Sequence, residues 1–238
     1  ADETIHTLVG PVGVFLPPGY VEVCDPPEEE GQAPDCRFCL SAEAEDPECK
    51  GPPARPQGFA GDGAPGTEAY MNQPFSQYAA PAGGMDMGPG DILYFTDTGN
   101  HLIRALHPDG TVHTIAGVAP APYDATGLAD GAPQGGYAGD GGPALEAQFN
   151  NPRDLAVDGE GAIYVSDREN SCVRKIDADR MVSTVAGVCG KRGDEGDRGD
   201  ATAAVLNRPY GLTLGPKGHL YIADTYNHRV RVVYLGTP

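Results

Sequence analysis

The chain has no tryptophan and few basic residues: its 238 residues include 16 lysines and arginines against 34 aspartates and glutamates. The resulting net charge of −18 repels the phosphates of nucleic acids and the anionic surface of a membrane. The sequence therefore predicts no nucleic-acid partner. A cationic protein or a divalent metal would instead be attracted at long range.

Long apolar runs are also missing. No segment approaches the roughly 20 apolar residues that a helix needs to cross a bilayer, so membrane insertion is not expected. The first residues of the given sequence carry no basic and apolar signal segment, and a strand-like pattern begins within a few residues of Ala1. This start is expected for a mature terminus left by removal of a signal peptide.

Cysteine is scarce but clustered, with four residues in one short stretch (Cys24, Cys36, Cys39 and Cys49) and a separate pair, Cys172 and Cys189. An even, clustered set indicates disulfides in an oxidising compartment, which predicts a secreted, periplasmic or cell-surface protein. The separate pair flanks a predicted hairpin and is expected to form a bridge. The first four permit three pairings, and zinc binding is the alternative.

One pattern occurs three times: an aromatic and aliphatic run ends in Asp, Asn follows three residues later, and Arg four residues after that. The copies are Leu93–Asp97 with Asn100 and Arg104, Ile163–Asp167 with Asn170 and Arg174, and Leu220–Asp224 with Asn227 and Arg231. Each copy also has a loop of the Gly-Asp-Gly type and short strands separated by tight turns. Such strands predict four-stranded antiparallel meanders, and repeated meanders predict an all-β propeller.

The repeats divide the chain into three predicted parts. Residues 58–238 contain three blades, at about 58–117, 138–190 and 191–238. The last blade lacks a fourth strand, but Thr4–Gly10 matches Thr111–Gly117 nearly position for position. We therefore expect residues 1–10 to supply a strand that completes a last blade.

Residues 11–57 form a predicted acidic, disulfide-stapled insert without a strand pattern, in which nine acids between Asp25 and Glu48 face one base, Arg37. We expect this insert to be the contact region for a partner. Its candidate binding residues are Glu28, Glu29, Glu30, Asp35, Glu43, Glu45, Asp46 and Glu48. Further insertions, at Val118–Tyr137 and between Pro74 and Gly90, are expected to be surface loops.

The repeated polar residues have structural interpretations. The Asp at each strand end and the Asn that follows are expected to hold a turn, since both side chains bond nearby backbone groups. The repeated Arg is expected to pair with that Asp or to cover apolar surface. The loop aspartates, Asp62, Asp140 and Asp194, are either turn residues or weak calcium ligands.

Two segments carry a family resemblance, Asp224–Arg231 (DTYNHRVR) and Asp97–Arg104 (DTGNHLIR). Both closely resemble the NHL repeat, and the resemblance covers about residues 58–235 and the strand at 4–10. It implies a β-propeller, most often six-bladed. The implied functions range from protein- or RNA-binding scaffolds to a few metal-dependent enzymes.

Three blades cannot enclose an axis. The ring is therefore expected to be completed to six blades by a second copy of the chain, with an unlike partner or a truncated chain as alternatives. The expected function is that of an exported, non-enzymatic scaffold that binds a protein or small ligand. The alternative is a metal-dependent lyase or hydrolase with calcium or zinc on the propeller axis, held by histidines such as His101 and His228.

Overall fold

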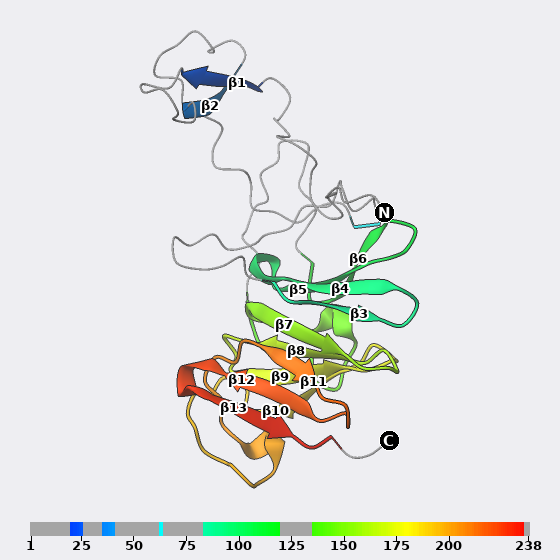
Figure 1. Ribbon diagram of the computed structural model, residues 1–238, viewed down its shortest axis with the longest axis vertical. Helices are drawn as coiled ribbons and strands as arrows, with labels where there is room; N and C mark the ends of the chain where they lie inside the picture. Colours follow the sequence, from blue (N-terminus) through cyan, green and yellow to red (C-terminus); the bar gives the residue numbers. More distant parts are fainter. Residues whose placement is uncertain (1–19, 26–34, 41–61, 64–82, 120–134, 236–238) are drawn as a thin grey trace.

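The computed structural model describes residues 20–25, 35–40, 62–63, 83–119 and 135–235 of the chain (Figure 1). Its sheets are all antiparallel, and two of them have four strands. The predicted all-β fold of four-stranded blades is confirmed. Among the described residues, no helix is long and apolar enough to cross a bilayer.

Three blades follow one another along the chain, each a simple meander. The first contains β3 (Met85–Gly88), β4 (Ile92–Asp97), β5 (Leu102–Leu106) and β6 (Val112–Ala116). The second contains β7 (Pro152–Val157), β8 (Ile163–Asp167), β9 (Cys172–Ile176) and β10 (Val182–Ala186). The third contains β11 (Leu212–Leu214), β12 (Leu220–Asp224) and β13 (Arg229–Val233).

Short 3-10 helices lie in the connections. They are η2 (Thr98–Asn100), η3 (Ala144–Glu146), η4 (Ala201–Ala203) and η5 (Thr225–Asn227). The helices η2 and η5 both end at a histidine in the left-handed conformation, at His101 (φ 59°) and His228 (φ 54°). Ser171 has the same conformation (φ 55°) at the matching turn of the second blade.

The innermost strand of the first blade was predicted to be part of a surface loop, and that prediction is wrong. The strand β3 lies inside the supposed insertion between Pro74 and Gly90. It lacks the Leu-Ala-Val signature of β7. Asp86 of β3 instead accepts a hydrogen bond from the N–H of Val157 at 2.9 Å, so contact with the second blade helps to hold this strand in place.

The acidic insert also contains strands that its sequence pattern did not predict. The strands β1 (Tyr20–Asp25) and β2 (Asp35–Leu40) form a separate antiparallel pair. The remainder of the insert, residues 1–10 and most of Val118–Tyr137 lie outside the described residues. The predicted closing strand and the part boundaries therefore stay predictions.

The blades stack face to face through alternating side chains of their strands. Ile163 and Val165 of β8 pack into a core shared with the first blade, while Tyr164 between them packs into a core shared with the third blade. All residues of β8 are buried as a result. This two-sided burial explains why Ile163, Tyr164 and Val165 are apolar in succession, unlike the alternating residues of a strand with one face in water.

Hydrogen bonds tie neighbouring blades together at one rim. The Thr98 hydroxyl donates to the carbonyl of Pro152 at 2.8 Å, and the N–H of Asn151 donates to Nδ1 of His101 at 2.9 Å. Between the second and third blades, the Ser166 hydroxyl donates to the carbonyl of Tyr210 at 2.7 Å. His101 therefore has a structural role between blades.

Candidate functional site

The Asp at the end of each second strand holds a turn, as the sequence predicts. Asp167 is fully buried and accepts hydrogen bonds from Asn170 Nδ2 at 2.8 Å and from the N–H of Asn150 at 2.7 Å. The third blade repeats this arrangement around Asp224, with Asn227 at 2.8 Å and the N–H of Asn207 at 2.8 Å. These bonds fasten the loop that precedes each blade to its second strand.

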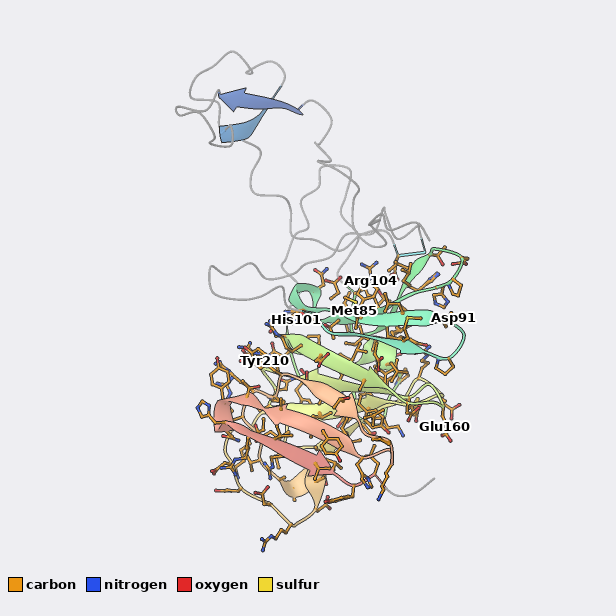
Figure 2. The ribbon with its side chains drawn as sticks, in the orientation of Figure 1. Met85, Asp91, His101, Arg104, Glu160 and Tyr210 are labelled. Carbon is orange, nitrogen blue, oxygen red and sulfur yellow. A yellow bond between two sulfur atoms is a disulfide. The ribbon has the colours of Figure 1, made fainter. Side chains whose placement is uncertain are left out.

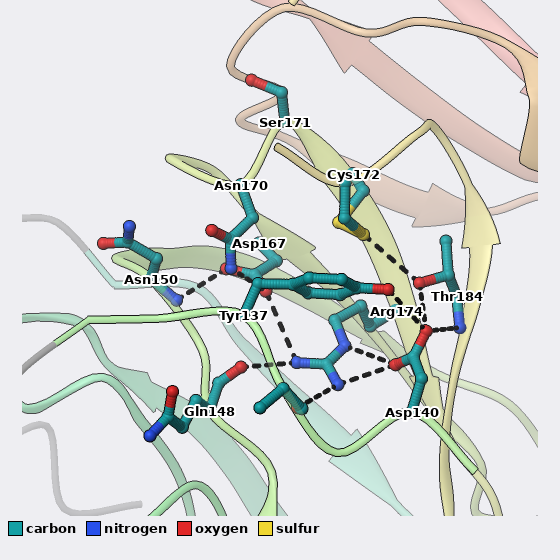
Figure 3. Close-up of a disulfide and its surroundings, with 12 residues drawn as sticks. Tyr137, Asp140, Gln148, Asn150, Asp167, Asn170, Ser171, Cys172, Arg174 and Thr184 are labelled. Carbon is teal, nitrogen blue, oxygen red and sulfur yellow. Dashed lines mark hydrogen bonds and ion pairs between the residues drawn. A yellow bond between two sulfur atoms is a disulfide. The ribbon is translucent and has the colours of Figure 1, made fainter. Parts of the chain in front are cut away.

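The repeated arginine is the centre of the same network (Figure 3). Arg174 is completely buried and lies 3.7 Å from Asp167 and 2.7 Å from Asp140. Its guanidinium also donates to the carbonyls of Gln148 at 2.6 Å and Ala138 at 2.9 Å. One side chain thus joins the strands β8 and β9 to the loop before β7.

Asp140 connects this network to the outermost strand. Its carboxylate accepts hydrogen bonds from the Thr184 N–H and hydroxyl on β10 and from the Tyr137 hydroxyl at 3.1 Å. Burial acts to raise the pKa of Asp140, but the bonds from Thr184 and the bonds and charge of Arg174 outweigh it and lower the pKa. The ionised carboxylate is therefore the form that the folded blade favours.

The proposed calcium ligands are engaged with arginine in the structure. Asp62 lies 3.2 Å from Arg104 and accepts from the Thr114 hydroxyl at 3.0 Å, which matches the surroundings of Asp140. Within the described ranges, no three His, Cys, Asp or Glu side chains lie close enough together to hold a metal ion. The calcium interpretation stays a prediction.

In the third blade, the structural counterpart of Asp140 is Asp197 rather than the predicted Asp194. Asp197 lies 2.7 Å from Arg231, the counterpart of Arg174, while Asp194 pairs with Arg229 at 3.3 Å. The sequence holds a signal for this assignment, because Asp197 precedes Asn207 by the same ten residues that separate Asp140 from Asn150.

The predicted bridge between Cys172 and Cys189 is present. It joins β9 to the loop after β10, beside a depression of about 570 Å³ that Asp140 and Thr184 help to line. In the insert, Asp35 begins β2, and Cys24 of β1 is the register partner of Cys36. Cys39 also lies on β2. The other predicted binding residues and Cys49 fall outside the described residues: Glu28, Glu29, Glu30, Glu43, Glu45, Asp46 and Glu48.

The outer face of the third blade is open, in contrast to the same face of the other blades. Tyr221 is 39% exposed, while its counterparts Tyr94 and Tyr164 are each 4% exposed. Val230 is 72% exposed, whereas its counterpart Val173 is fully buried in the core between the second and third blades. An apolar face of this kind marks a contact surface.

The edge of the third blade is open as well. The strands β5 and β9 each pair on both sides, whereas β13 pairs only with β12 among the described residues. Asp62 and Asp140 each accept a threonine hydroxyl from the fourth strand of their blade, and no described residue supplies one to Asp197. The third blade therefore lacks both a fourth strand and a covering blade within the described part of the chain.

Comparisons with known families agree with the repeat pattern. The model of the teneurin NHL domain matches residues 125–195, and the model of the NHL repeat matches residues 206–233. NHL repeat-containing protein 2 of Bos taurus is 30% identical over 75% of this chain and 24% of that protein. The Homo sapiens protein of the same name is 28% identical over 61% of this chain and 19% of that protein.

Teneurin-1 of Gallus gallus is 35% identical over 60% of this chain, but that match spans only 6% of teneurin-1. The chain therefore spans a quarter or less of the length of each of these relatives. Among solved structures, a Bacteroides thetaiotaomicron protein of unknown function is similar with a TM-score of 0.52 and 24% identity, over 70% of this chain and 39% of that one. An auxiliary nutrient binding protein from the same species also has a TM-score of 0.52, with 20% identity, over 67% of this chain and 39% of that one. These likenesses show the β-propeller fold.

Replacing Arg174 by Met should lower the free energy of unfolding by about 3–5 kcal/mol, because Asp167 would stay buried without its charged partner. Urea denaturation followed by circular dichroism measures this loss. Arg229→Met is the matched control, since Arg229 forms exposed ion pairs and should cost at most about 1 kcal/mol. Equal losses in the two variants would contradict the assigned role of the buried network.

Asp140 should make stability depend on pH. Because its pKa is lower in the folded than in the unfolded chain, its ionised form stabilises the fold above about pH 4, and this contribution is lost as the pH falls through the folded pKa. The stability difference between the wild type and Asp140→Asn should therefore shrink from pH 7 to pH 3. Asp179→Asn, at an exposed turn, should differ little from the wild type at either pH. A difference for Asp140→Asn that stays constant with pH would disprove the assignment.

Proposed function

We propose that this chain, which carries NHL repeats folded as β-propeller blades, is a binding and assembly scaffold whose third blade is completed by a second copy of the chain. The observation that carries the proposal is the exposure of Val230 and Tyr221, at positions that are buried wherever a neighbouring blade is present. The complete blades within the same chain are the internal reference for this comparison.

The donated strand in this proposal is Thr4–Gly10 of the second copy. In the first blade, Thr114 on the fourth strand donates to Asp62 at 3.0 Å. The matching residue in the N-terminal segment is Thr7, because Thr4–Gly10 follows the sequence of Thr111–Gly117. Thr7 would supply the hydroxyl that Asp197 lacks among the described residues, and the strand would pair with the edge of β13 to which no described strand is bonded.

A blade of the second copy would cover the outer face of the third blade. Burying Val230 there would contribute about 1–2 kcal/mol, since a fully buried Val side chain is worth at least about 1.5 kcal/mol. Tyr221 would add apolar area on the same face. Its register partner on β13 is Val232, which lies two residues from Val230 and therefore on the same side of the sheet. Two chains of three blades make a ring of six, which closed twofold symmetry permits.

The bridge between Cys172 and Cys189 supports export to an oxidising compartment. The acidic insert at 11–57 is the proposed contact region for a basic partner, and the scaffold role is non-enzymatic. Attraction between an acidic insert and a basic partner is screened by salt, so the interaction should weaken at high ionic strength.

The molar mass in solution tests the assembly. The wild type is expected to have twice the chain mass of 24.8 kDa by light scattering. Val230→Lys should have the mass of one chain, because a lysine on the shared face would be buried without a partner charge. Its circular dichroism spectrum should remain that of the wild type, since Val230 is already exposed within one chain.

The matched control is Leu145→Lys, which places the same charge at another exposed apolar residue, 57% exposed, in the second blade. This variant should keep the mass of the wild type. A wild type with the mass of one chain, or a Val230→Lys variant that keeps twice that mass, would refute the paired ring.

Deleting residues 11–57 tests the insert. The wild type is expected to bind a fluorescent octalysine peptide, and the deleted chain should lose this binding while its circular dichroism and thermal unfolding retain the signature of folded blades. Anisotropy at low and high salt measures the interaction. Octalysine binding that survives the deletion would show that the insert is not the contact region.

A further inference from the structure

Basic and aromatic side chains gather on one rim between the second and third blades. This arginine–tyrosine patch consists of Arg153, Arg168, Arg192, Arg208, Tyr210 and Tyr226, with Glu169 among them. Figure 2 shows Tyr210 on the same side as His101, opposite Asp91 and Glu160, so the patch lies at the rim where inner strands begin and second strands end.

The patch is continuous. The Cζ atoms of Arg153 and Arg168 lie 4.7 Å and 4.9 Å from the centre of the Tyr210 ring. Tyr210 stacks on Tyr226 with ring centres 6.4 Å apart, and Arg208 lies 5.1 Å from the Tyr226 ring. Each contact is within the range of cation–π or aromatic attraction, so the side chains hold one another in place.

The patch has more positive than negative charge. Glu169 is the one carboxylate that its arginines share: Arg168 donates to Oε1, while Arg192 and Arg208 donate to Oε2 at 2.8 Å and 3.1 Å. Arg153 forms no ion pair among the described residues. Four arginines against one glutamate leave an excess of three positive charges on a chain whose net charge is −18.

A further carboxylate beside the patch is bonded to the backbone. Asp154, next to Arg153 in β7, accepts hydrogen bonds from the N–H groups of Leu155 and Leu212. At Tyr226, hydrogen bonds from Arg208 and Arg168 lower the pKa of the phenol, as expected in a positive environment. The rim therefore presents arginine donors and an exposed tyrosine that is 47% accessible.

Part of the patch stands at positions where the residue type differs between repeats. Arg153 and Tyr210 stand at the same position of two repeats, directly after the Pro, and Glu169 and Tyr226 stand at the same position of the turn. The residues of the core and of the arginine network are of the same type in each repeat. The residue at each of these rim positions, in contrast, differs in type between the two repeats. A blade forms with either residue, so the fold of a blade does not require these side chains.

We propose that the arginine–tyrosine patch is a docking site for an acidic polypeptide segment. Arginine and tyrosine are the residues that dominate protein interfaces, and guanidinium groups bind carboxylates through paired hydrogen bonds. A long nucleic acid is disfavoured because the rest of the chain repels it, whereas a short acidic segment meets only the local charge. The site rests on the scaffold role but uses a different surface from the open third blade.

Fluorescence anisotropy of a labelled octaglutamate peptide with the full chain tests this site. Octaglutamate should bind tighter than a neutral Gly-Ser octapeptide, and raising the salt concentration should weaken it. Arg153→Gln and Arg192→Gln should each weaken binding at least about fivefold, because each removes one charge partner of the peptide. Glu169→Gln should strengthen binding, since it releases arginine donors.

Lys217→Gln is the matched control, since Lys217 is exposed in the turn between β11 and β12, outside the patch, and it should bind like the wild type. Val230→Lys should also retain octaglutamate binding, even where it changes the assembly. The site is refuted by any of three results: equal binding of the neutral peptide, an equal loss in Lys217→Gln, or loss of binding in Val230→Lys. Tighter binding of single-stranded oligothymidylate than of octaglutamate would also refute it, in favour of nucleic acid.

Discussion

The repeated arginine, which is fully buried in the first two blades, makes the interactions on which the blades depend. Arg174 has no exposed surface, and its cost of desolvation is offset because its donors meet Asp140, Asp167 and two backbone carbonyls. The loop that it binds precedes the innermost strand and follows the previous blade. The network therefore stabilises a blade and also fixes the loop through which the chain enters that blade from the previous one.

The third blade separates the arginine network from the packing between blades. Its arginine, Arg231, retains the ion pairs with Asp197 and Asp224, although no described strand completes this blade and no described blade covers it. What is missing is burial: Val230 and Tyr221 stay exposed where their counterparts pack into cores. Polar networks inside a blade and apolar contacts between blades are thus separate sources of stability, and only the second requires another blade.

Charge is distributed unevenly over the molecule. The acidic residues give the chain its net charge of −18, yet arginines of the described blades concentrate at one rim beside Tyr210 and Tyr226. The buried arginines are neutralised by loop and strand aspartates, whereas the rim arginines share Glu169. A scaffold with an acidic insert and a basic rim would be able to select partners of opposite charge at different surfaces.

Much of the fold was predictable from the sequence, because its determinants are local. The run that ends in Asp167, the Asn three residues later and Arg174 specify a strand, a turn and a second strand within a dozen residues. The pairing of Cys172 with Cys189 follows from the same hairpin. Repetition of this local unit was enough to predict antiparallel blades and a propeller.

Other features were decided by the tertiary structure, since they depend on residues far apart in the chain. The strand β3 has a weak pattern of its own and is bonded to the second blade through Asp86 and Val157. Asp197 rather than Asp194 meets Arg231, a choice made by the geometry of a loop and a distant strand. The rim patch forms only because stacking brings Arg153 and Tyr210 from successive blades together. Local hydrogen bonds and periodicity therefore determined the repeating unit, and packing between units determined the surfaces available for binding.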